Sequence, residues 1–391
     1  MIPFIKKYIF ENWDKLDLGA RPEDLLFIKF ADRGIRNPAV GTISFLAKKI
    51  LYGKESPIFI LRIPRYAESE GAGQTLRNEY DNLNNVHAKL KGSSLTATIP
   101  KPILFTKVRS SAIFMLSVLP GKDMAMRIIE GNIQKSYIDN FRLAFSWLVE
   151  FQKSWGMETL EFNQDFVDKY VKRVFVVYRD TFPQNAGLHD RYFNRILAKA
   201  KRSYGKKVSV LPQHGDFHAA NIFVHKDRLS GVIDWEDFRE EGLPCHDLFH
   251  YIKTYLEGFY AFAEEQGKIQ GIEAIAWSQE WGRVVSDLAR SYCQAVRVDI
   301  ELMEIFLPLF LVETINVAGS FRKIAPHILR RNDILLGLEP FTIDDLRLYM
   351  SIFPYGALFK KASAEKNMEL AKHCQVKVGE IQKIANRKKA Q

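Results

Sequence analysis

Three side chains with metal-binding or proton-accepting chemistry stand at fixed intervals in the stretch QHGDFHAANIFVHKDRLSGVIDWE. Asp216 comes first, Asn221 follows five residues later, and Asp234 comes thirteen residues after Asn221. Carboxylate and amide oxygens suit Mg²⁺, which proteins usually hold with one or two carboxylates together with substrate phosphates. A remaining carboxylate can then orient a hydroxyl group and accept its proton. This set of residues therefore predicts transfer of a phosphoryl group to a hydroxyl.

Two short apolar strands are expected to position these side chains. The pattern predicts strands at Asn221–Val224 and Gly231–Trp235, joined by a polar turn. A tight hairpin of this kind would place Asn221 beside Asp234. Asp216 would then lie on the loop that leads into the first strand.

The motif His-Gly-Asp-x-x-x-x-Asn, followed by Ile-Asp-Trp-Glu, resembles that of the aminoglycoside phosphotransferase and choline kinase-like family of small-molecule kinases. The resemblance continues in Gly242, Pro244, Asp247 and Leu248, which follow in the family's order. It implies the protein kinase-like fold, with Gly215 where protein kinases usually have Arg. A plain hairpin with solvated acids at its ends is the alternative interpretation, and the complete pattern disfavours it.

The resemblance implies a role for each member of the motif. Asp216 would be the catalytic base, and Asn221 and Asp234 would hold Mg²⁺. Glu236 and His218 would be close enough to contact the substrate, although a His218 side chain that faces away is an equally good interpretation. The implied cofactors are Mg²⁺ and ATP, or another nucleoside triphosphate.

Further histidines are expected to support the fold. His214 would brace the backbone of the catalytic loop, and His246 and His250 would cap or pack near Asp247. We expect no zinc site among them, because oxygen ligands already define the metal position.

The first part of the chain reads as strands around a glycine-bearing turn. Residues 27–30 and 40–47 are predicted strands, and the turn between them contains Gly34 and Asn37. Kinase-like folds lay such a turn over the ATP phosphates, and the resemblance implies this role for Gly34 and Asn37. No Gly-x-Gly-x-x-Gly is present, so a plain hairpin turn stays an open alternative.

A third strand, over residues 57–65, carries Arg62 near its end. Kinase-like folds present a Lys here, which contacts the ATP phosphates and pairs with a Glu on the next helix. The resemblance implies that Arg62 takes this role, with Glu79 as its partner on a helix over residues 75–83. Arg is not equivalent to Lys, because a guanidinium is a fork and an ammonium a point charge. Glu79 on the exposed face of an amphipathic helix is the alternative.

Residues 112–118 read as the last strand before Pro120-Gly121. The family resemblance makes this the hinge, where Ser117, Val118 and Leu119 would lie beside the adenine. We therefore predict a nucleotide-binding N-lobe over residues 1–118, β-rich with one helix. A C-lobe over residues 119–391 would hold the catalytic loop, the metal site, the helical acceptor-binding region and a basic C-terminal helix.

Composition is that of a soluble globular protein, with 47% hydrophobic and 26% charged residues. The most apolar segment, Ile305–Val312, is only eight residues long, so no transmembrane segment is expected. The cysteines at 245, 293 and 374 show no metal-ligand spacing, which favours a cytoplasmic protein. The net charge of +10 could attract nucleotides or anionic surfaces. No nucleic-acid-binding motif accompanies it, so nucleic acid is not expected as a partner.

Together these observations predict an α+β, two-lobed protein kinase-like fold and an ATP- and Mg²⁺-dependent small-molecule kinase. The acceptor would be a hydroxyl of an aminoglycoside-, sugar- or amino alcohol-type molecule. A nucleotide-binding regulatory pseudokinase without turnover is the first alternative, and an enzyme that phosphorylates a protein side chain is the second. The residues beside Asp234 are acidic and suit a cationic acceptor, whereas the overall charge favours an anionic or neutral one.

Overall fold

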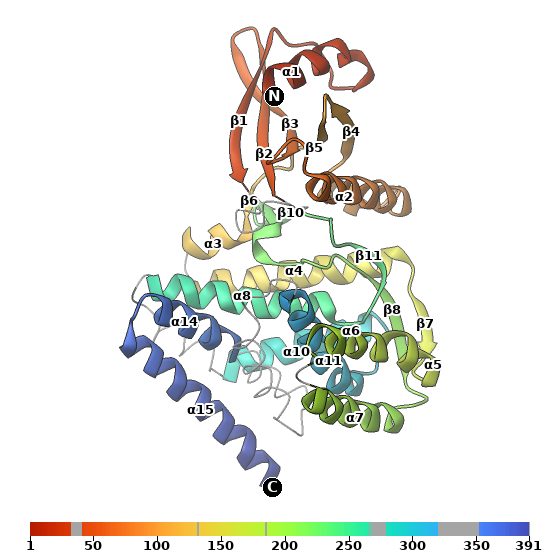
Figure 1. Ribbon diagram of the computed structural model, residues 1–391, viewed down its shortest axis with the longest axis vertical. Helices are drawn as coiled ribbons and strands as arrows, with labels where there is room; N and C mark the ends of the chain where they lie inside the picture. Colours follow the sequence, from red (N-terminus) through yellow and green to blue (C-terminus); the bar gives the residue numbers. More distant parts are fainter. Residues whose placement is uncertain are drawn as a thin grey trace. The chain divides into compact units, whose positions relative to one another are not determined.

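The computed structural model of the chain describes residues 1–32, 41–130, 133–183, 186–265, 267, 279–319 and 352–390 (Figure 1). The backbone forms two compact units. Unit 1 comprises Met1–Asp123 and Asn221–Phe238, and unit 2 comprises Met124–Ala220 and Arg239–Gln391.

A five-stranded antiparallel sheet forms most of unit 1, with the strand order β1-β2-β3-β5-β4. The strands are β1 (Asp24–Asp32), β2 (Thr42–Leu51), β3 (Lys54–Pro64), β4 (Pro102–Val108) and β5 (Ser111–Ser117). The strands predicted at residues 27–30, 57–65 and 112–118 are confirmed as parts of β1, β3 and β5. The one predicted at 40–47 is confirmed from residue 42 onward.

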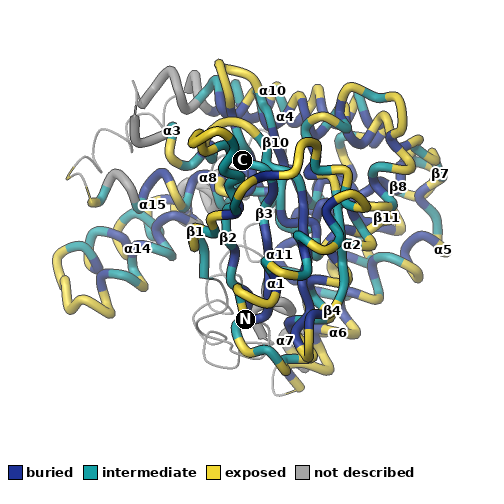
Figure 2. The backbone as a smooth tube through the Cα atoms, turned by 90° about the horizontal axis from the view of Figure 1, so that it is seen from above, coloured by how far each residue is buried: buried dark blue, intermediate teal, exposed yellow. Residues whose placement is uncertain are grey.

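One face of this sheet is sealed. Phe27, Ala47 and Phe59 lie opposite one another across β1, β2 and β3. They pack into a core with the buried side chains of α1 (Ile2–Glu11) and with Trp13. Figure 2 colours the backbone by how far each residue is buried, with buried residues in dark blue. Because side chains alternate between the faces of a strand, their neighbours Ile28, Leu46 and Ile60 point to the opposite face.

That opposite face is covered only in part. Helix α2 (Glu70–Lys89) packs on β3, β4 and β5, and its first turn is capped by the Ser69 hydroxyl, which accepts from Ala72 N. The Tyr80 ring of α2 meets the Phe114 ring of β5 edge-on, with the ring centroids 5.9 Å apart. Over β1, none of the residues that the structure describes closes this face, and Ile28 is 38% exposed.

A smaller sheet of unit 1, in the order β10-β9-β6, carries the predicted metal residues. Its strands are β6 (Lys122–Asp123), β9 (Ile222–His225) and β10 (Arg228–Val232). The predicted hairpin is confirmed, but its turn is shorter than expected. Lys226 and Asp227 both have positive φ, 48° and 58°, the pattern of a two-residue type I′ turn. The second strand therefore begins at Arg228 and ends two residues before Asp234.

Gly121 lets β6 approach β9. Its φ is 103°, and a Cβ at this position would lie 2.4 Å from the carbonyl oxygen of Val224. The Ser230 hydroxyl donates to the carbonyl of the neighbouring Pro120 at 2.6 Å. The segment around Asn221–Phe238 is thereby joined to the end of the N-terminal part of the chain.

Unit 2 is mostly helical, with a small antiparallel sheet in the order β11-β8-β7. Its strands are β7 (Glu158–Glu161), β8 (Lys207–Gln213) and β11 (Arg239–Gly242). Its helices are α3 (Met124–Glu130), α4 (Ile133–Trp155), α5 (Gln164–Phe166), α6 (Arg173–Thr181), α7 (Ala186–Arg202), α8 (His246–Glu265), α10 (Gln279–Ala295), α11 (Met303–Gly319), α14 (Ile352–Ala364) and α15 (Met368–Ala390), with a π-helical turn at Val167–Lys172 between α5 and α6.

The apolar segment Ile305–Val312 lies within α11, and its large side chains are buried. This helix packs on α6, α7 and α8, which accounts for its apolar character. In the described part of the chain, no helix combines the length and the apolar character needed to cross a membrane.

The basic C-terminal helix α15 packs on α14, which in turn packs on α8. Ile381 of α15 is fully buried, whereas Val376 is 51% exposed. One face of α15 therefore packs on the helices of unit 2, and Val376 lies on a side that is exposed.

The predicted α+β class is confirmed, with a β-rich N-terminal part and a helical remainder. The division into lobes 1–118 and 119–391 stays a prediction. The two compact units differ from these predicted lobes, because the pairing of β6 with β9 attaches Asn221–Phe238 to unit 1.

Candidate active site

The loop after β8 carries Asp216 and is fixed by a buried carboxylate of unit 2. Asp247, in the first turn of α8, is fully buried and accepts hydrogen bonds from His214 N at 2.7 Å and Gly215 N at 3.0 Å. His214 Nδ1 accepts from Asp216 N at 3.3 Å. Gly215 has a φ of 87°, which a residue with a side chain adopts only with strain. The loop therefore holds Asp216 at a sharp, braced turn.

Asp247 stays ionised in this position. Burial alone would raise the pKa of its carboxyl group, but His246 beside it and the backbone bond from His214 outweigh burial and keep the pKa below its usual value. A carboxylate that accepts backbone N–H bonds is stabilised in its charged form. The loop is thus anchored by a charge rather than by packing alone.

Two imidazoles meet the side chain of Asp216. His218 Nε2 lies 3.3 Å from Asp216 Oδ2, and His250 Nε2 lies 3.2 Å from Asp216 Oδ1. Burial raises the pKa of Asp216, but these two contacts outweigh it and hold the pKa well below its ordinary value. Asp216 is therefore ionised at neutral pH. His218 faces the carboxylate rather than away from it, and His250 contacts Asp216 where packing near Asp247 was expected.

The predicted metal residues lie together on the hairpin of unit 1. Ile233 N donates to Asn221 O at 2.9 Å, which continues the β9–β10 ladder to the residue before Asp234. Asp234 then turns out of the ladder with a φ of 73°. Positive φ in a residue with a side chain costs free energy and concentrates at functional sites. Asn221 and Asp234 are both buried, with 1% and 7% of their surface exposed.

Arg62 and Glu79 form the predicted pair. Arg62 Nη1 hydrogen-bonds Glu79 Oε2, although the two residues are 17 positions apart, on β3 and α2. The same nitrogen lies 3.5 Å from Asp234 Oδ1, and Nη2 lies 3.8 Å from Glu236 Oε2. Glu79 is 1% exposed, so the alternative of a surface Glu is wrong.

This buried cluster carries more negative than positive charge. Burial lowers the pKa of Arg62, but Glu79, Asp234 and Glu236 outweigh it and raise the pKa above its ordinary value. Burial and the neighbouring Asp234 raise the pKa of Glu236 to about 7. One guanidinium thus faces three acidic side chains, an arrangement that favours a further cation.

The donor set fits a hard divalent ion. Glu79, Asp234 and Glu236 each offer a carboxylate oxygen, and these oxygens lie within 4.8 Å of one another. Oxygen donors of this kind are the ligands of Mg²⁺. Asn221 lies in a 3-10 turn (Ala219–Asn221) directly before β9, and the contribution of its amide oxygen to this set stays a prediction. The sequence indicated Asn221 and Asp234, and the structure adds two carboxylates beside Asp234.

The structure describes some of the remaining predicted nucleotide contacts and not others. Gly34 and Asn37 lie outside the described residues. Ser117 ends β5 and is bonded to Lys101 in both directions: Ser117 N donates to Lys101 O at 2.9 Å, and Lys101 N donates to the Ser117 hydroxyl at 2.8 Å. Val118 and Leu119 follow outside the strand, half-buried. Their contact with a nucleotide base stays a prediction.

Asp216 belongs to unit 2, whereas Asn221 and Asp234 belong to unit 1. Their convergence on one reacting phosphate therefore stays a prediction from the motif. Within each unit the predicted residues do assemble, Asp216 with the loop that Asp247 anchors and Asp234 with Arg62 and Glu79.

Sequence reasoning did not assign two functional contacts. The first is the contact of His250 with Asp216, since His250 was expected near Asp247. The sequence feature that could have indicated it is the four-residue spacing between His246 and His250, which puts both rings on one side of α8. Asn82 donates to the carbonyl oxygen of Trp235 at 2.8 Å and so ties α2 to the residue after Asp234. No pattern in the sequence pointed to Asn82.

A model of a phosphotransferase enzyme family matches residues 43–284, well over half of the chain. The chain belongs to this family. Membership makes it a phosphotransferase, a kinase that uses an alcohol group as acceptor, in agreement with the motif that resembled small-molecule kinases. No curated protein matches the chain.

Several solved structures of aminoglycoside and macrolide phosphotransferases are similar to the chain. A thermostable mutant of aminoglycoside phosphotransferase APH(4)-Ia, with ADP and hygromycin B, is 10% identical over 97% of this chain and 98% of that chain, with a TM-score of 0.41. APH(3'')-Id from Streptomyces rimosus is 13% identical over 80% and 98%, with a TM-score of 0.40. Macrolide 2'-phosphotransferase MphH from Brachybacterium faecium is 17% identical over 82% and 98%, with a TM-score of 0.39. The family assignment rests on the sequence match and not on these scores.

Proposed function

We propose that this phosphotransferase is ATP- and Mg²⁺-dependent and transfers the γ-phosphoryl group to a hydroxyl of a small molecule. The observation that carries the proposal is the buried Arg62, bonded to Glu79 and 3.5 Å from Asp234. In the proposed role, Arg62 would be a phosphate-binding cation directly beside a carboxylate that suits Mg²⁺. Kinase phosphoryl transfer requires this combination of cation, metal and positioned base.

The open part of the main sheet supports a nucleotide site in unit 1. Ile28, Leu46 and Ile60 lie opposite one another across β1, β2 and β3 and remain partly exposed. Arg62 follows Ile60 by two residues and shares its face of the sheet. An apolar surface that ends in a buried guanidinium suits a molecule with a flat apolar base and a phosphate chain. Ser117, Val118 and Leu119 would meet the edge of that base.

Each residue of the site would act mainly through position and charge. Bound Mg²⁺ would neutralise the developing charge on the phosphates, held by Asn221 and Asp234. Arg62 would fix the phosphate chain, with Glu79 fixing Arg62. Asp216, ionised at neutral pH, would orient the acceptor hydroxyl and take its proton. Catalysis of this kind depends on preorganised geometry and electrostatic stabilisation.

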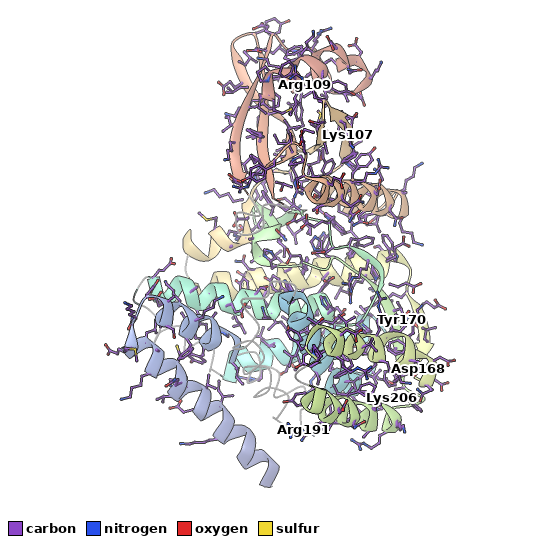
Figure 3. All side chains as sticks on the ribbon, in the orientation of Figure 1. Lys107, Arg109, Asp168, Tyr170, Arg191 and Lys206 are labelled. Atoms are coloured by element: carbon purple, nitrogen blue, oxygen red, sulfur yellow. The ribbon has the colours of Figure 1, made fainter. Side chains whose placement is uncertain are left out.

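The acceptor class is proposed as an aminoglycoside-, sugar- or amino alcohol-type molecule. The acidic run after Asp234 is less anionic than its sequence implies. Glu241 accepts from Lys169 Nζ at 2.9 Å and from the Tyr170 hydroxyl at 3.2 Å, within unit 2. Tyr170 is labelled in Figure 3. Glu236 faces Arg62. A neutral or weakly charged hydroxyl compound therefore fits the described residues as well as a strongly cationic one.

The decisive experiment compares turnover in two Asp→Asn variants. Asp216→Asn keeps the size of the side chain but removes the proton acceptor, so kcat should fall by about 10²–10⁴, while the KM for ATP stays nearly constant. Asp227→Asn, in the exposed turn of the hairpin, is the control and should turn over normally. The assay follows consumption of MgATP in the presence of aminoglycosides, sugars, amino alcohols and amino acids. Nucleotide binding without turnover in the wild type would favour a pseudokinase instead.

A further inference from the structure

Each carboxylate oxygen of Asp216 lies close to a histidine ring nitrogen, 3.3 Å from His218 Nε2 and 3.2 Å from His250 Nε2, and His250 is the histidine that no motif assigns. We propose that His250 is a positioning residue: with His218 it holds the Asp216 carboxylate by its two oxygens and fixes the direction in which the catalytic base points. This inference rests on the proposed function of Asp216. It extends that function to a residue of α8, 34 positions along the chain, that contacts the base and not the acceptor.

The ring of His250 is itself fixed from the side of α11. The Phe310 ring meets the rings of His250 and His246 edge-on, with centroid distances of 6.4 and 5.3 Å. The His246 ring lies parallel to that of His250, with an interplanar angle of 7°. His250 Nε2 is buried and has no hydrogen-bond partner of good geometry among the described residues, so the Asp216 oxygen 3.2 Å away is the acceptor within its reach. A buried ring nitrogen in this position costs free energy unless it serves a partner.

Burial is the main reason that the pKa of His250 lies below its ordinary value. Burial lowers its pKa, the contact with Asp216 opposes that shift, and Lys253 and His246 add to the lowering. His218 is the other imidazole near it, with a ring-centroid distance of 6.2 Å. A neutral imidazole can donate Nε2–H to Asp216 and leave the carboxylate its full charge.

His246 forms the outer part of this arrangement. Its Nε2 lies 3.4 Å from Glu313 Oε2 on α11, and its Nδ1 lies 3.7 Å from Asp247 Oδ1. Burial lowers the pKa of His246, but Asp247 and Glu313 outweigh burial and raise it. The positive charge is therefore favoured on His246, next to two carboxylates, and disfavoured on His250.

This division of charge has a consequence for the base. While His250 is neutral, Asp216 has an oriented donor and can accept a proton from the hydroxyl. Once His250 is protonated at acid pH, its positive charge stabilises the ionised carboxylate. Asp216 then accepts a proton less readily, so turnover falls at acid pH.

The first test needs no acceptor. The pKa of each histidine is measured by following its ring signals in NMR spectra as the pH is varied, in the wild type and in Asp216→Asn. Removal of the carboxylate should lower the pKa of His250, because its contact with Asp216 opposes the lowering by burial. The ring signals of His87, which contacts Pro100 O, and of the exposed His225 serve as controls for the integrity of the fold. An unchanged His250 pKa in Asp216→Asn would overturn the proposal, whether or not Asp216 proves to be the catalytic base.

The second test separates positioning from structural support. His250→Gln retains an N–H donor, and His250→Leu removes it. Relative to wild type, His250→Leu should lower kcat for MgATP consumption roughly 10–100-fold with little change in the KM for ATP. His250→Gln should recover most of the loss and shift the acid limb of the pH profile. Equal losses in both variants, or loss through KM alone, would contradict positioning; thermal melting of each variant shows that it is folded. Absence of turnover in the wild type would remove the proposed function and leave the NMR result to stand by itself.

Discussion

Arg62 lies at the centre of a cluster of charged side chains in unit 1. It is 6% exposed and faces Glu79, Asp234 and Glu236. A complete buried ion pair contributes little net stability. Removal of one partner leaves the other charge buried without compensation, which is strongly destabilising. Loss of the Arg62 guanidinium should therefore lower the stability of the fold, whether or not a nucleotide is bound.

We expect Arg62→Met to destabilise the fold by roughly 3–5 kcal/mol. The matched control is Arg77→Met on α2, where Arg77 pairs with Asp81 at 2.8 Å but is 50% exposed. Exposed pairs contribute about 0–1 kcal/mol, so this control should be nearly neutral. Urea unfolding of both variants at pH 7 measures the difference. Similar losses in the two variants would show that Arg62 is not held as the structure has it.

At the scale of residues, the sequence indicated several of the side chains that the structure brings together within each unit. The Arg62–Glu79 pair was predicted from a strand charge and a helix Glu, and it is formed. The contact of His250 with Asp216 could not be predicted. A four-residue spacing places a side chain on one side of a helix, but only tertiary packing determines what that side meets.

At the scale of elements, the first turn of α8 fixes the catalytic loop. Asp247 accepts two backbone N–H bonds there, and its pKa is held below the usual value. A carboxyl group with a lower pKa in the folded state than in the unfolded state stabilises the fold above its unfolded pKa, about 3.9. That stabilisation is lost as the pH falls below this value.

Asp247→Asn should therefore destabilise the fold at pH 7 by roughly 1–3 kcal/mol, because an amide cannot accept both N–H bonds with a charged oxygen. The difference in the free energy of unfolding between wild type and Asp247→Asn should become smaller as the pH falls below about 4. Asp168→Asn is the control: Asp168 also has a lowered pKa, from Lys172 beside it, but its side chain is 48% exposed. Urea unfolding at pH 7 and at lower pH makes the comparison. A gap that stays constant with pH would contradict the role given to the ionised carboxylate.

Helix α15 offers a second prediction for an element. Ile381 is fully buried and Val376 is 51% exposed on the same helix. Ile381→Asp should lower the free energy of unfolding by several kcal/mol, since it buries an unpaired charge, whereas Val376→Asp should be nearly neutral. The same two variants test an anionic-membrane role for the basic helix. If Val376→Asp reduced sedimentation with phosphatidylserine vesicles and left stability unchanged, membrane contact would be the better description.

The elements themselves were easier to predict than their ends. Alternating apolar residues indicated the strands of the main sheet, because one of its faces is buried. The hairpin turn was misjudged because Lys226 and Asp227 are not a typical type I′ pair, yet both adopt positive φ. The φ of 73° at Asp234 is a further property that the pattern of residue types did not reveal.

At the scale of the whole chain, the motif is divided between the two compact units. Asp216 lies near the end of the first part of unit 2, which runs to Ala220, and Asn221 begins the part that joins unit 1, five residues after Asp216. The predicted base and the predicted metal ligands are thus connected by a short stretch of backbone, although they belong to different units. Sequence order alone would have assigned all of them to one C-terminal lobe.

This division predicts that nucleotide binding and turnover can be separated by mutation. A ligand that binds only the folded state stabilises it by about 2.7 kcal/mol at one hundred times Kd. ATP with Mg²⁺ should therefore raise the melting temperature of the wild type, and Asp216→Asn should keep that increase. Asp234→Asn should lose most of the Mg²⁺-dependent part, because it removes a metal ligand.

Asp227→Asn is the matched control for Asp234→Asn. Both residues lie on the same hairpin and both have positive φ, 58° and 73°, so the two substitutions share any backbone effect. Only Asp234 belongs to the carboxylate cluster around Arg62. Titration of Mg²⁺ at fixed ATP, followed by thermal melting, gives the comparison. An equal Mg²⁺-dependent increase in both variants would place the metal elsewhere and would leave Arg62 and Glu79 as a structural pair only.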